Sequence, residues 1–388
     1  MTLSYYDFKY LLGYQDSDNF LVRNIFAEGK ERTKTCKEFL SSIVFEDLDH
    51  ESIALMPFFL SHNGDAVTGG NLNMRIRGIH KWSMCKNSLN LSGILPLLKA
   101  YEKAGIPVML LKGIVLAHTY YQGLGLRMME DIDLTVPPEY FDKAAGIAEQ
   151  MGFQGKDSGH SIDFCKDGKY RIDLHRIILK ESYRNERREA IMWQRAIKTN
   201  FYGLQVFVPR PEDMLLGIWL NEFFDIVGNE GQKGRNKKWV LDTKMILTNT
   251  PEFDWQDFIA SCYHFRVMPQ IICMLTLYRD LSSCRMPAKQ ETDALLALLG
   301  KDEEYNKSRM HVFATMIFYL QKSFLFHYQK IYCTYLYITG KTLEESIDYR
   351  GYKNYLYARY QADGLPSYLL SEGRQFGKRL RRLSGAET

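Results

Sequence analysis

The sequence predicts an α/β (α+β) fold in which a small mixed sheet lies between two helical regions. Apolar residues at helical spacing over Leu89 to Ala104 predict a helix before the sheet. Short apolar and alternating segments after Pro107 predict strands, and amphipathic helical patterns return after Pro211. These changes divide the 388 residues into an N-terminal helical region (1–96), a core (97–208) and a larger C-terminal helical region (209–388).

The core is expected to alternate strands and helices before it ends in a hairpin. A five-residue apolar run at 107–111 predicts a buried strand, and period-2 alternation at 131–136 predicts a second one. Asp167-Gly168 stands between two alternating segments, 161–165 and 170–175, which is a strong hairpin signal. The remaining predicted elements are helices at 114–121 and 140–151 and a last strand at 204–208.

Composition limits the partners and the compartment. Lys and Arg total 50 against 46 Asp and Glu, and a net charge of +4 is too small to indicate a general nucleic-acid binder. The basic tail at 374–382 is the segment that would contact nucleic acid, and otherwise it is a solvated end. No apolar stretch is long enough to span a membrane, so no membrane partner is expected. Seven cysteines without a Cys-x-x-Cys pair fit neither a disulfide framework nor a zinc site, and we expect a reducing cytoplasm.

Three aspartates in the core are the candidate catalytic residues. Asp131 and Asp133 are two apart on a predicted strand, so their side chains share one face. Asp173 stands between apolar residues on the predicted hairpin. If the two strands are neighbours, the carboxylates converge, and charges about 4 Å apart repel by about 4 kcal/mol at an effective dielectric near 20. Oxygen ligands at this density favour Mg²⁺ or Mn²⁺.

Lys112 and Gly113 end the first predicted strand and begin a helix. A helix N-terminus offers unpaired N–H groups that suit a phosphate, and glycine lets the phosphate approach the backbone. The Lys112 side chain adds a positive charge. Arg127 is four residues before Asp131, and it either reaches a phosphate or forms a salt bridge that holds the aspartate loop.

These residues together resemble the uncharacterised nucleotidyltransferase family of the polymerase-β-like superfamily. The resemblance is carried by Leu111-Lys112-Gly113, Arg127, Asp131-Ile132-Asp133-Leu134 and Ile172-Asp173-Leu174-His175. It is clearest over residues 95–180, and it continues more weakly from the N-terminal helices to about Ile259. One departure is Ile114, which follows Gly113 where the superfamily usually has Ser or Gly.

The resemblance implies a nucleotidyltransferase core with bound Mg²⁺ or Mn²⁺ and an NTP as co-substrate. Asp131 and Asp133 would hold the metal ions, and Asp173 would be the third carboxylate, which activates the acceptor hydroxyl. The expected reaction transfers an NMP, AMP in the first instance, to a hydroxyl or phosphate acceptor with release of pyrophosphate. The acceptor itself is not identified by the sequence.

Three further residues have two interpretations each. Lys238 and Asp242 are four apart on one predicted helical face, so Lys238 either reaches the nucleotide phosphates or pairs with Asp242. His175 shares a face with Asp173, and it either acts at the site, by positioning a carboxylate or contacting substrate, or is a hydrogen-bonded structural histidine.

Two other functions fit the same residues. A metal-dependent glycosyltransferase also uses an Asp-x-Asp pair to hold a nucleotide-sugar, and it would release a nucleoside diphosphate in place of pyrophosphate. A non-catalytic nucleotide sensor on the same fold would bind NTP without turnover. The third carboxylate and the Lys-Gly helix start favour nucleotidyl transfer over the glycosyltransferase.

Overall fold

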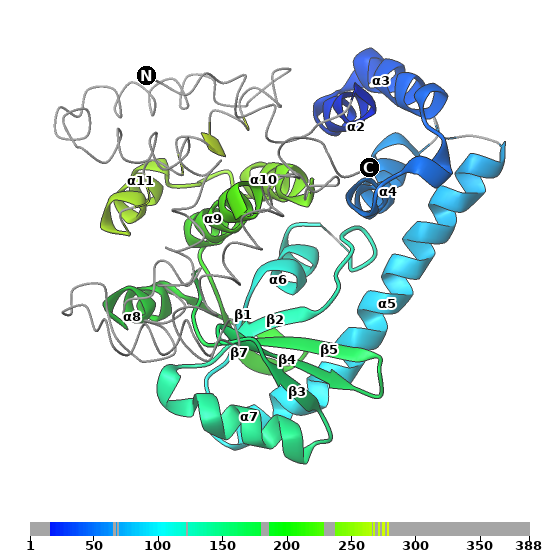
Figure 1. Cartoon of the computed structure of the whole chain (residues 1–388). Coiled ribbons are helices and arrows are strands. Elements are labelled where there is room, and N and C mark those ends of the chain that lie inside the picture. Colours follow the sequence, from blue (N-terminus) through cyan, green and yellow to red (C-terminus); the bar gives the residue numbers. More distant parts are fainter. Residues whose placement is uncertain are drawn as a thin grey trace, which may run out of the picture.

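The computed structural model places a mixed sheet among helices from both ends of the chain (Figure 1). It describes residues 16–64, 67, 70–121, 123–179, 186–228 and 237–265, together with the single residues 267, 271, 274, 275 and 278. The predicted C-terminal helical region after residue 278, including the basic tail, lies outside these residues. Within the described chain, no helix is both long enough and apolar enough to cross a membrane.

The sheet has seven strands in the order β3-β4-β5-β2-β1-β7-β6. Two pairs are parallel, β2 with β5 and β1 with β7, and the other four are antiparallel. The predicted mixed sheet is therefore confirmed. The strands are β1 (Met109–Leu110), β2 (Ile132–Thr135), β3 (Gln154–Asp157), β4 (Ser161–Lys166), β5 (Tyr170–His175), β6 (Ile197–Phe201) and β7 (Leu204–Val208).

The predicted hairpin is β4–β5, and its turn has the geometry that the sequence requires. Asp167 and Gly168 both have positive φ, 55° and 65°, and with Lys169 they form a three-residue connection between Lys166 and Tyr170, which pair across the hairpin. A second hairpin, β6–β7, turns at Tyr202 and Gly203, again with positive φ at both residues. The sequence predicted β7 but neither β6 nor the exposed edge strand β3.

Helices come from all three predicted regions. Before the sheet stand α2 (Asp16–Phe26), α3 (Gly29–Ser42), the 3₁₀ turn η1 (Phe45–Asp47), α4 (His50–Asn63) and α5 (Gly70–Lys103). Within the core are α6 (Lys112–Thr119), η3 (Pro138–Tyr140) and α7 (Phe141–Gln150). The others are α8 (Glu186–Arg195), α9 (Pro211–Gly228), α10 (Lys238–Asn249) and α11 (Trp255–His264).

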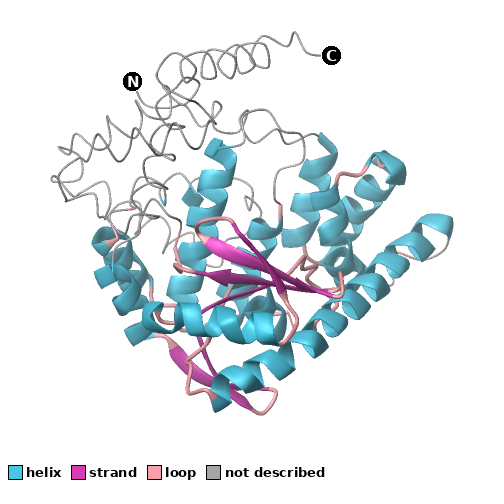
Figure 2. Cartoon of the chain, turned by 60° about the horizontal axis from the view of Figure 1, so that its bottom comes forward, coloured by secondary structure: helices cyan, strands magenta, loops and turns pink. Residues whose placement is uncertain are grey.

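One hydrophobic core joins these regions, as its fully buried members Leu21, Leu134 and Trp219 illustrate. The 34-residue helix α5 starts in the N-terminal region and continues past the boundary predicted at residue 96. The division into three regions stays a prediction. In Figure 1, α7 lies below the sheet, while α6, α9 and α10 lie above it, and Figure 2 shows helices around the strands.

Helix α5 fixes the β4–β5 hairpin by a close contact at one glycine. A Cβ atom built on Gly93 would stand 2.1 Å from the Tyr170 ring, which is far inside van der Waals contact. Nearby, the Asn90 side chain accepts a hydrogen bond of 2.8 Å from the backbone N–H of Arg171. Helix and hairpin therefore meet at a distance that only glycine permits, and this contact holds the start of β5.

We predict that Gly93→Ala destabilises the protein, by about 1–3 kcal/mol, because the Tyr170 ring has to move away from α5. The matched control is Gly78→Ala in the same helix, where an added Cβ meets nothing within 4 Å. That change should stabilise by about 0.5–1 kcal/mol, as alanine does in a helix interior. Urea unfolding of both variants measures the difference, and equal effects of the two would contradict the contact.

Candidate active site

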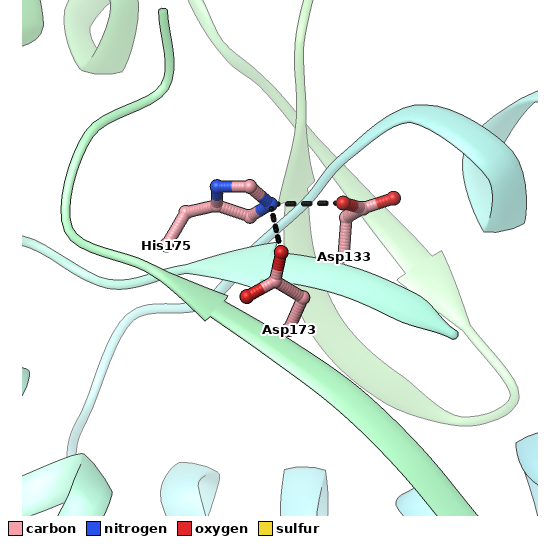
Figure 3. Close-up of side chains that lie close together, drawn as sticks. All are labelled: Asp133, Asp173 and His175. Carbon is pink, nitrogen blue, oxygen red and sulfur yellow. Dashed lines mark hydrogen bonds and ion pairs between the residues drawn. The ribbon is translucent and has the colours of Figure 1, made fainter. Parts of the chain in front are cut away.

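Parallel pairing of β2 with β5 sets Asp133 directly beside Asp173. The residues that flank them, Ile132 and Leu134 on β2 and Ile172 on β5, are buried against the core. Because side chains alternate along a strand, burying these residues turns both aspartates to the opposite face of the sheet. The predicted convergence of carboxylates is thus seen for this pair (Figure 3). Asp131 directly precedes β2.

His175 bridges the two carboxylates from the end of β5. Its Nε2 lies 2.8 Å from Asp133 Oδ1 and 3.1 Å from Asp173 Oδ2 (Figure 3). The Thr135 hydroxyl donates to the backbone carbonyl of His175 at 2.9 Å, which ties the end of β5 to β2. Of the two sequence interpretations, a histidine that positions carboxylates matches these contacts.

These contacts decide the charges of the cluster. Burial acts to raise the pKa of Asp133, but the Lys112 ammonium and the hydrogen bond with His175 outweigh it and hold the pKa far below its usual range. Burial likewise opposes ionisation of Asp173, yet His175 keeps its pKa low. Burial and Lys112 act to lower the pKa of His175, and hydrogen bonds to both aspartates raise it overall.

Asp131 behaves in the opposite way. Burial, followed by the negative charges of Asp133 and Asp173, raises the pKa of Asp131 to about 6. Its carboxylate is therefore costly to ionise in the protein without a cation. The repulsion that the sequence predicted for clustered aspartates therefore adds to the effect of burial at Asp131, which lies outside the strand.

Lys112 contacts the cluster from the first residue of α6. Its Nζ lies 2.8 Å from Asp133 Oδ1 and 3.3 Å from His175 Nε2. The backbone of Lys112 has φ = 43°, a left-handed conformation that is uncommon for a residue with a side chain. Strained backbone of this kind concentrates at functional sites. The structure shows the Lys112 ammonium in contact with Asp133 and His175.

Arg127 forms a buried ion pair with Asp242 of α10. Its Nε and Nη2 donate to the two carboxylate oxygens of Asp242, each at 2.8 Å, and the Tyr121 hydroxyl donates to Asp242 Oδ1 at 2.6 Å. The salt-bridge interpretation of Arg127 is therefore the one seen, although its partner is Asp242. The guanidinium also explains Gly113, because a Cβ there would stand 2.6 Å from Arg127 Nη1.

The predicted i,i+4 ion pair between Lys238 and Asp242 is not formed, because Asp242 pairs with Arg127. Lys238 Nζ instead lies 3.8 Å from Glu51 Oε1 on α4. Beside it, the buried Lys237 ammonium donates to Asp49 Oδ2 at 2.8 Å and to Ser52 Oγ at 2.7 Å. These contacts attach the first turn of α4 to the start of α10.

A cavity of about 330 Å³ brings the predicted site residues together. Eight of the nine predicted site residues line the cavity, and the ninth, His175, does not. They are Lys112, Gly113, Arg127, Asp131, Asp133, Asp173, Lys238 and Asp242. The sequence missed the polar residues Asn221 and Glu222 of α9, which also line it. The sequence does contain an indication of them, because Asn221-Glu222 interrupts the otherwise apolar run 214–224.

Two carboxylates of this cavity, together with His175, form a donor set that fits a divalent cation. Among the described residues, Asp133, Asp173 and His175 each offer one ligand atom, and these atoms all lie within 4.8 Å of one another. Asp173 Oδ1 is buried and accepts no hydrogen bond from the described residues, so one oxygen is left for a ligand. The two carboxylates suit Mn²⁺ or Mg²⁺, and the imidazole nitrogen suits the softer Mn²⁺ better than Mg²⁺, although Asp131 is not a member of this set.

A carboxylate-lined cavity beside basic side chains is compatible with metal-assisted phosphoryl transfer. The chain belongs to the family of uncharacterised nucleotidyltransferases, whose model matches residues 59–282, more than half of its length. It is thus a nucleotidyltransferase, which favours this function over the glycosyltransferase and sensor alternatives. A search of curated proteins finds no significant match.

Two solved structures are among those that the chain resembles. One is the solution structure of the antibiotic-resistance factor ANT(2'')-Ia, at 15% identity and a TM-score of 0.35, covering 48% of this chain and 96% of that one. The other is an antigenic nucleotidyltransferase-like protein from Paracoccidioides brasiliensis, at 15% identity and a TM-score of 0.32, covering 52% of this chain and 91% of that one.

The raised pKa of Asp131 predicts a pH-dependent gain in stability for Asp131→Asn. The folded protein binds this proton more tightly than the unfolded chain does, so stability from Asp131 is present below about pH 4 and is lost as the pH rises through about 6. In EDTA at pH 7.5 the variant should be more stable by about 1–2 kcal/mol, and the gain should shrink towards pH 4. Thermal unfolding measures this, and a gain independent of pH would contradict it.

Proposed function

We propose that the protein transfers the NMP group of an NTP, AMP in the first instance, to a hydroxyl or phosphate oxygen of an acceptor. The acceptor oxygen attacks the α-phosphorus, the bond from that phosphorus to the bridging oxygen breaks, and pyrophosphate leaves. The observation that carries the proposal is the register of Asp133 with Asp173 at the wall of the cavity, in a chain of this family.

Asp133 and Asp173 hold the divalent cation, Mg²⁺ or Mn²⁺, with His175 as the nitrogen ligand or as the group that orients both carboxylates. The cation, when bound, neutralises the charge that develops on the phosphate oxygens. Asp131 supplies a further carboxylate to the same cavity. Because its ionisation is costly in the cation-free protein, a positive charge in the cavity favours its charged form.

Asp173 accepts the proton of the acceptor hydroxyl. Its low pKa keeps it ionised at neutral pH, and its buried Oδ1 accepts no hydrogen bond from the described residues. A general base has to be within about 3 Å of the proton that it takes, and the position of Asp173 in the cavity wall gives an acceptor that access.

The cationic side of the cavity receives the phosphates. Lys112 and Lys238 supply charge from the first residues of α6 and α10, and Gly113 supplies a backbone N–H at the start of α6. Arg127 acts differently, because both carboxylate oxygens of Asp242 hold its guanidinium. Its role, with Asp242, is to position the loop before β2 against α10.

Asp173→Asn tests the proposed base directly. Turnover should fall by about 100-fold or more, while NTP binding in the presence of Mn²⁺ should weaken much less, since the amide oxygen still offers the cation a ligand but takes no proton. The control is Asp163→Asn. Asp163 on β4 is paired with Asp173 across the two strands, but it does not line the cavity. That variant should keep its turnover.

The measurements are pyrophosphate release and a nucleotide-binding isotherm, with each labelled NTP in turn and a cell extract as the source of acceptor. Mass spectrometry of whatever gains a nucleotide identifies the acceptor and tests the assignment of AMP. Parallel loss of binding and turnover in Asp173→Asn would refute the role of general base and leave this residue as a metal ligand alone. No nucleotide transfer to any component of the extract would contradict the proposed reaction.

A further inference from the structure

We propose that the Lys112 ammonium is a tethered cation that competes with the divalent cation for Asp133, and that the NTP ends this competition by drawing the ammonium onto its phosphates. The inference rests on the proposed function and adds a form of control to the same site: cation and nucleotide bind cooperatively through one side chain. In this proposal Lys112 not only contacts phosphate but also couples the binding of the cation to the binding of the nucleotide.

The ammonium contacts two residues of the cation site. Lys112 Nζ lies 2.8 Å from Asp133 Oδ1 and 3.3 Å from His175 Nε2, and both residues belong to the set that fits a metal ion. Two positive charges at one carboxylate repel each other strongly in a low-dielectric site. Cation binding therefore requires the ammonium to leave Asp133.

The Lys112 side chain has room to move away from Asp133 within the cavity. About a third of its side chain, 31%, is exposed, and it lines the cavity in which the phosphates are proposed to bind. Its backbone is fixed as the first residue of α6, so the four-carbon chain can swing while the Cα stays in place. A triphosphate beside it offers several negative oxygens in exchange for one carboxylate.

The other cations of the cavity are held differently. The Arg127 guanidinium makes two hydrogen bonds to Asp242, which is outside the set found to fit a metal among the described residues. Lys238 Nζ lies 3.8 Å from Glu51 Oε1 on α4. Of the three basic residues that line the cavity, Lys112 is the one with described contacts to two residues of that set.

This arrangement predicts a thermodynamic coupling. If NTP removes the ammonium from Asp133, it raises the affinity for the cation, and by linkage the cation raises the affinity for NTP by the same factor. Without nucleotide, the lysine holds cation affinity down. Replacing Lys112 by a neutral side chain should therefore have two opposite effects, tighter binding of the cation alone and weaker binding of the nucleotide.

Mn²⁺ binding to the full chain, followed by electron paramagnetic resonance, tests this without any turnover. Lys112→Met should bind Mn²⁺ alone about tenfold more tightly than the parent, within the usual range of coupling factors. Adding an NTP analogue that cannot release pyrophosphate should tighten Mn²⁺ binding in the parent and much less in the variant. Lys238→Met is the matched control, because it should weaken nucleotide binding and leave binding of Mn²⁺ alone unchanged.

Lys112→Arg keeps the charge and should keep the parent's weak affinity for Mn²⁺ alone, which separates loss of charge from any change in the fold. If Lys112→Met binds Mn²⁺ alone no more tightly than Lys112→Arg does, the competition is refuted and the proposed function still stands. The proposed function fails separately if Asp133→Asn binds Mn²⁺ and the NTP analogue as well as the parent does.

Discussion

The parallel pairing of β2 with β5 is the constraint on which the candidate active site depends. The pairing sets Asp133 beside Asp173, and burial of the residues that alternate with them leaves the two carboxylates no other face of the sheet. A slip of one residue would turn both into the core. His175, two residues after Asp173, then reaches both carboxylates, so one register creates the whole donor set. The same register brings negative charges close together, which costs free energy. In the cation-free protein the Lys112 ammonium offsets part of this cost by its contact with Asp133.

A second level of organisation comes from buried ion pairs between distant segments. Asp242 of α10 holds Arg127 of the loop before β2, and Lys237 at the start of α10 is held by Asp49 of α4. Breaking one partner of such a pair is costly because it leaves a buried charge alone. The pairs therefore fix α10 relative to the sheet, and with it Lys238, which lines the same cavity as the carboxylates. The N-terminal helices contribute to the site through this attachment.

The local chemistry of the core could be predicted from sequence, and the long-range contacts could not. The Asp167 hairpin and the β2 strand follow from turn residues and alternation, which short windows of sequence contain. The edge strands β3 and β6 were missed because they are largely exposed and carry little apolar alternation. Sequence left two interpretations of Arg127, since its partner Asp242 is 115 residues away. Ile114, which replaces the usual Ser or Gly, proves to be a fully buried core residue, so a hydroxyl at this position would not face the cavity.

The decisive measurement is a crystal structure with Mn²⁺ and an NTP analogue that cannot release pyrophosphate. We expect an anomalous peak within about 2.2 Å of oxygens of both Asp133 and Asp173, with the α-phosphate beside it and the Lys112 ammonium on the phosphates. A cation bound elsewhere, or a nucleotide outside the cavity lined by these carboxylates, would contradict the claim that the β2–β5 register builds the site of nucleotidyl transfer.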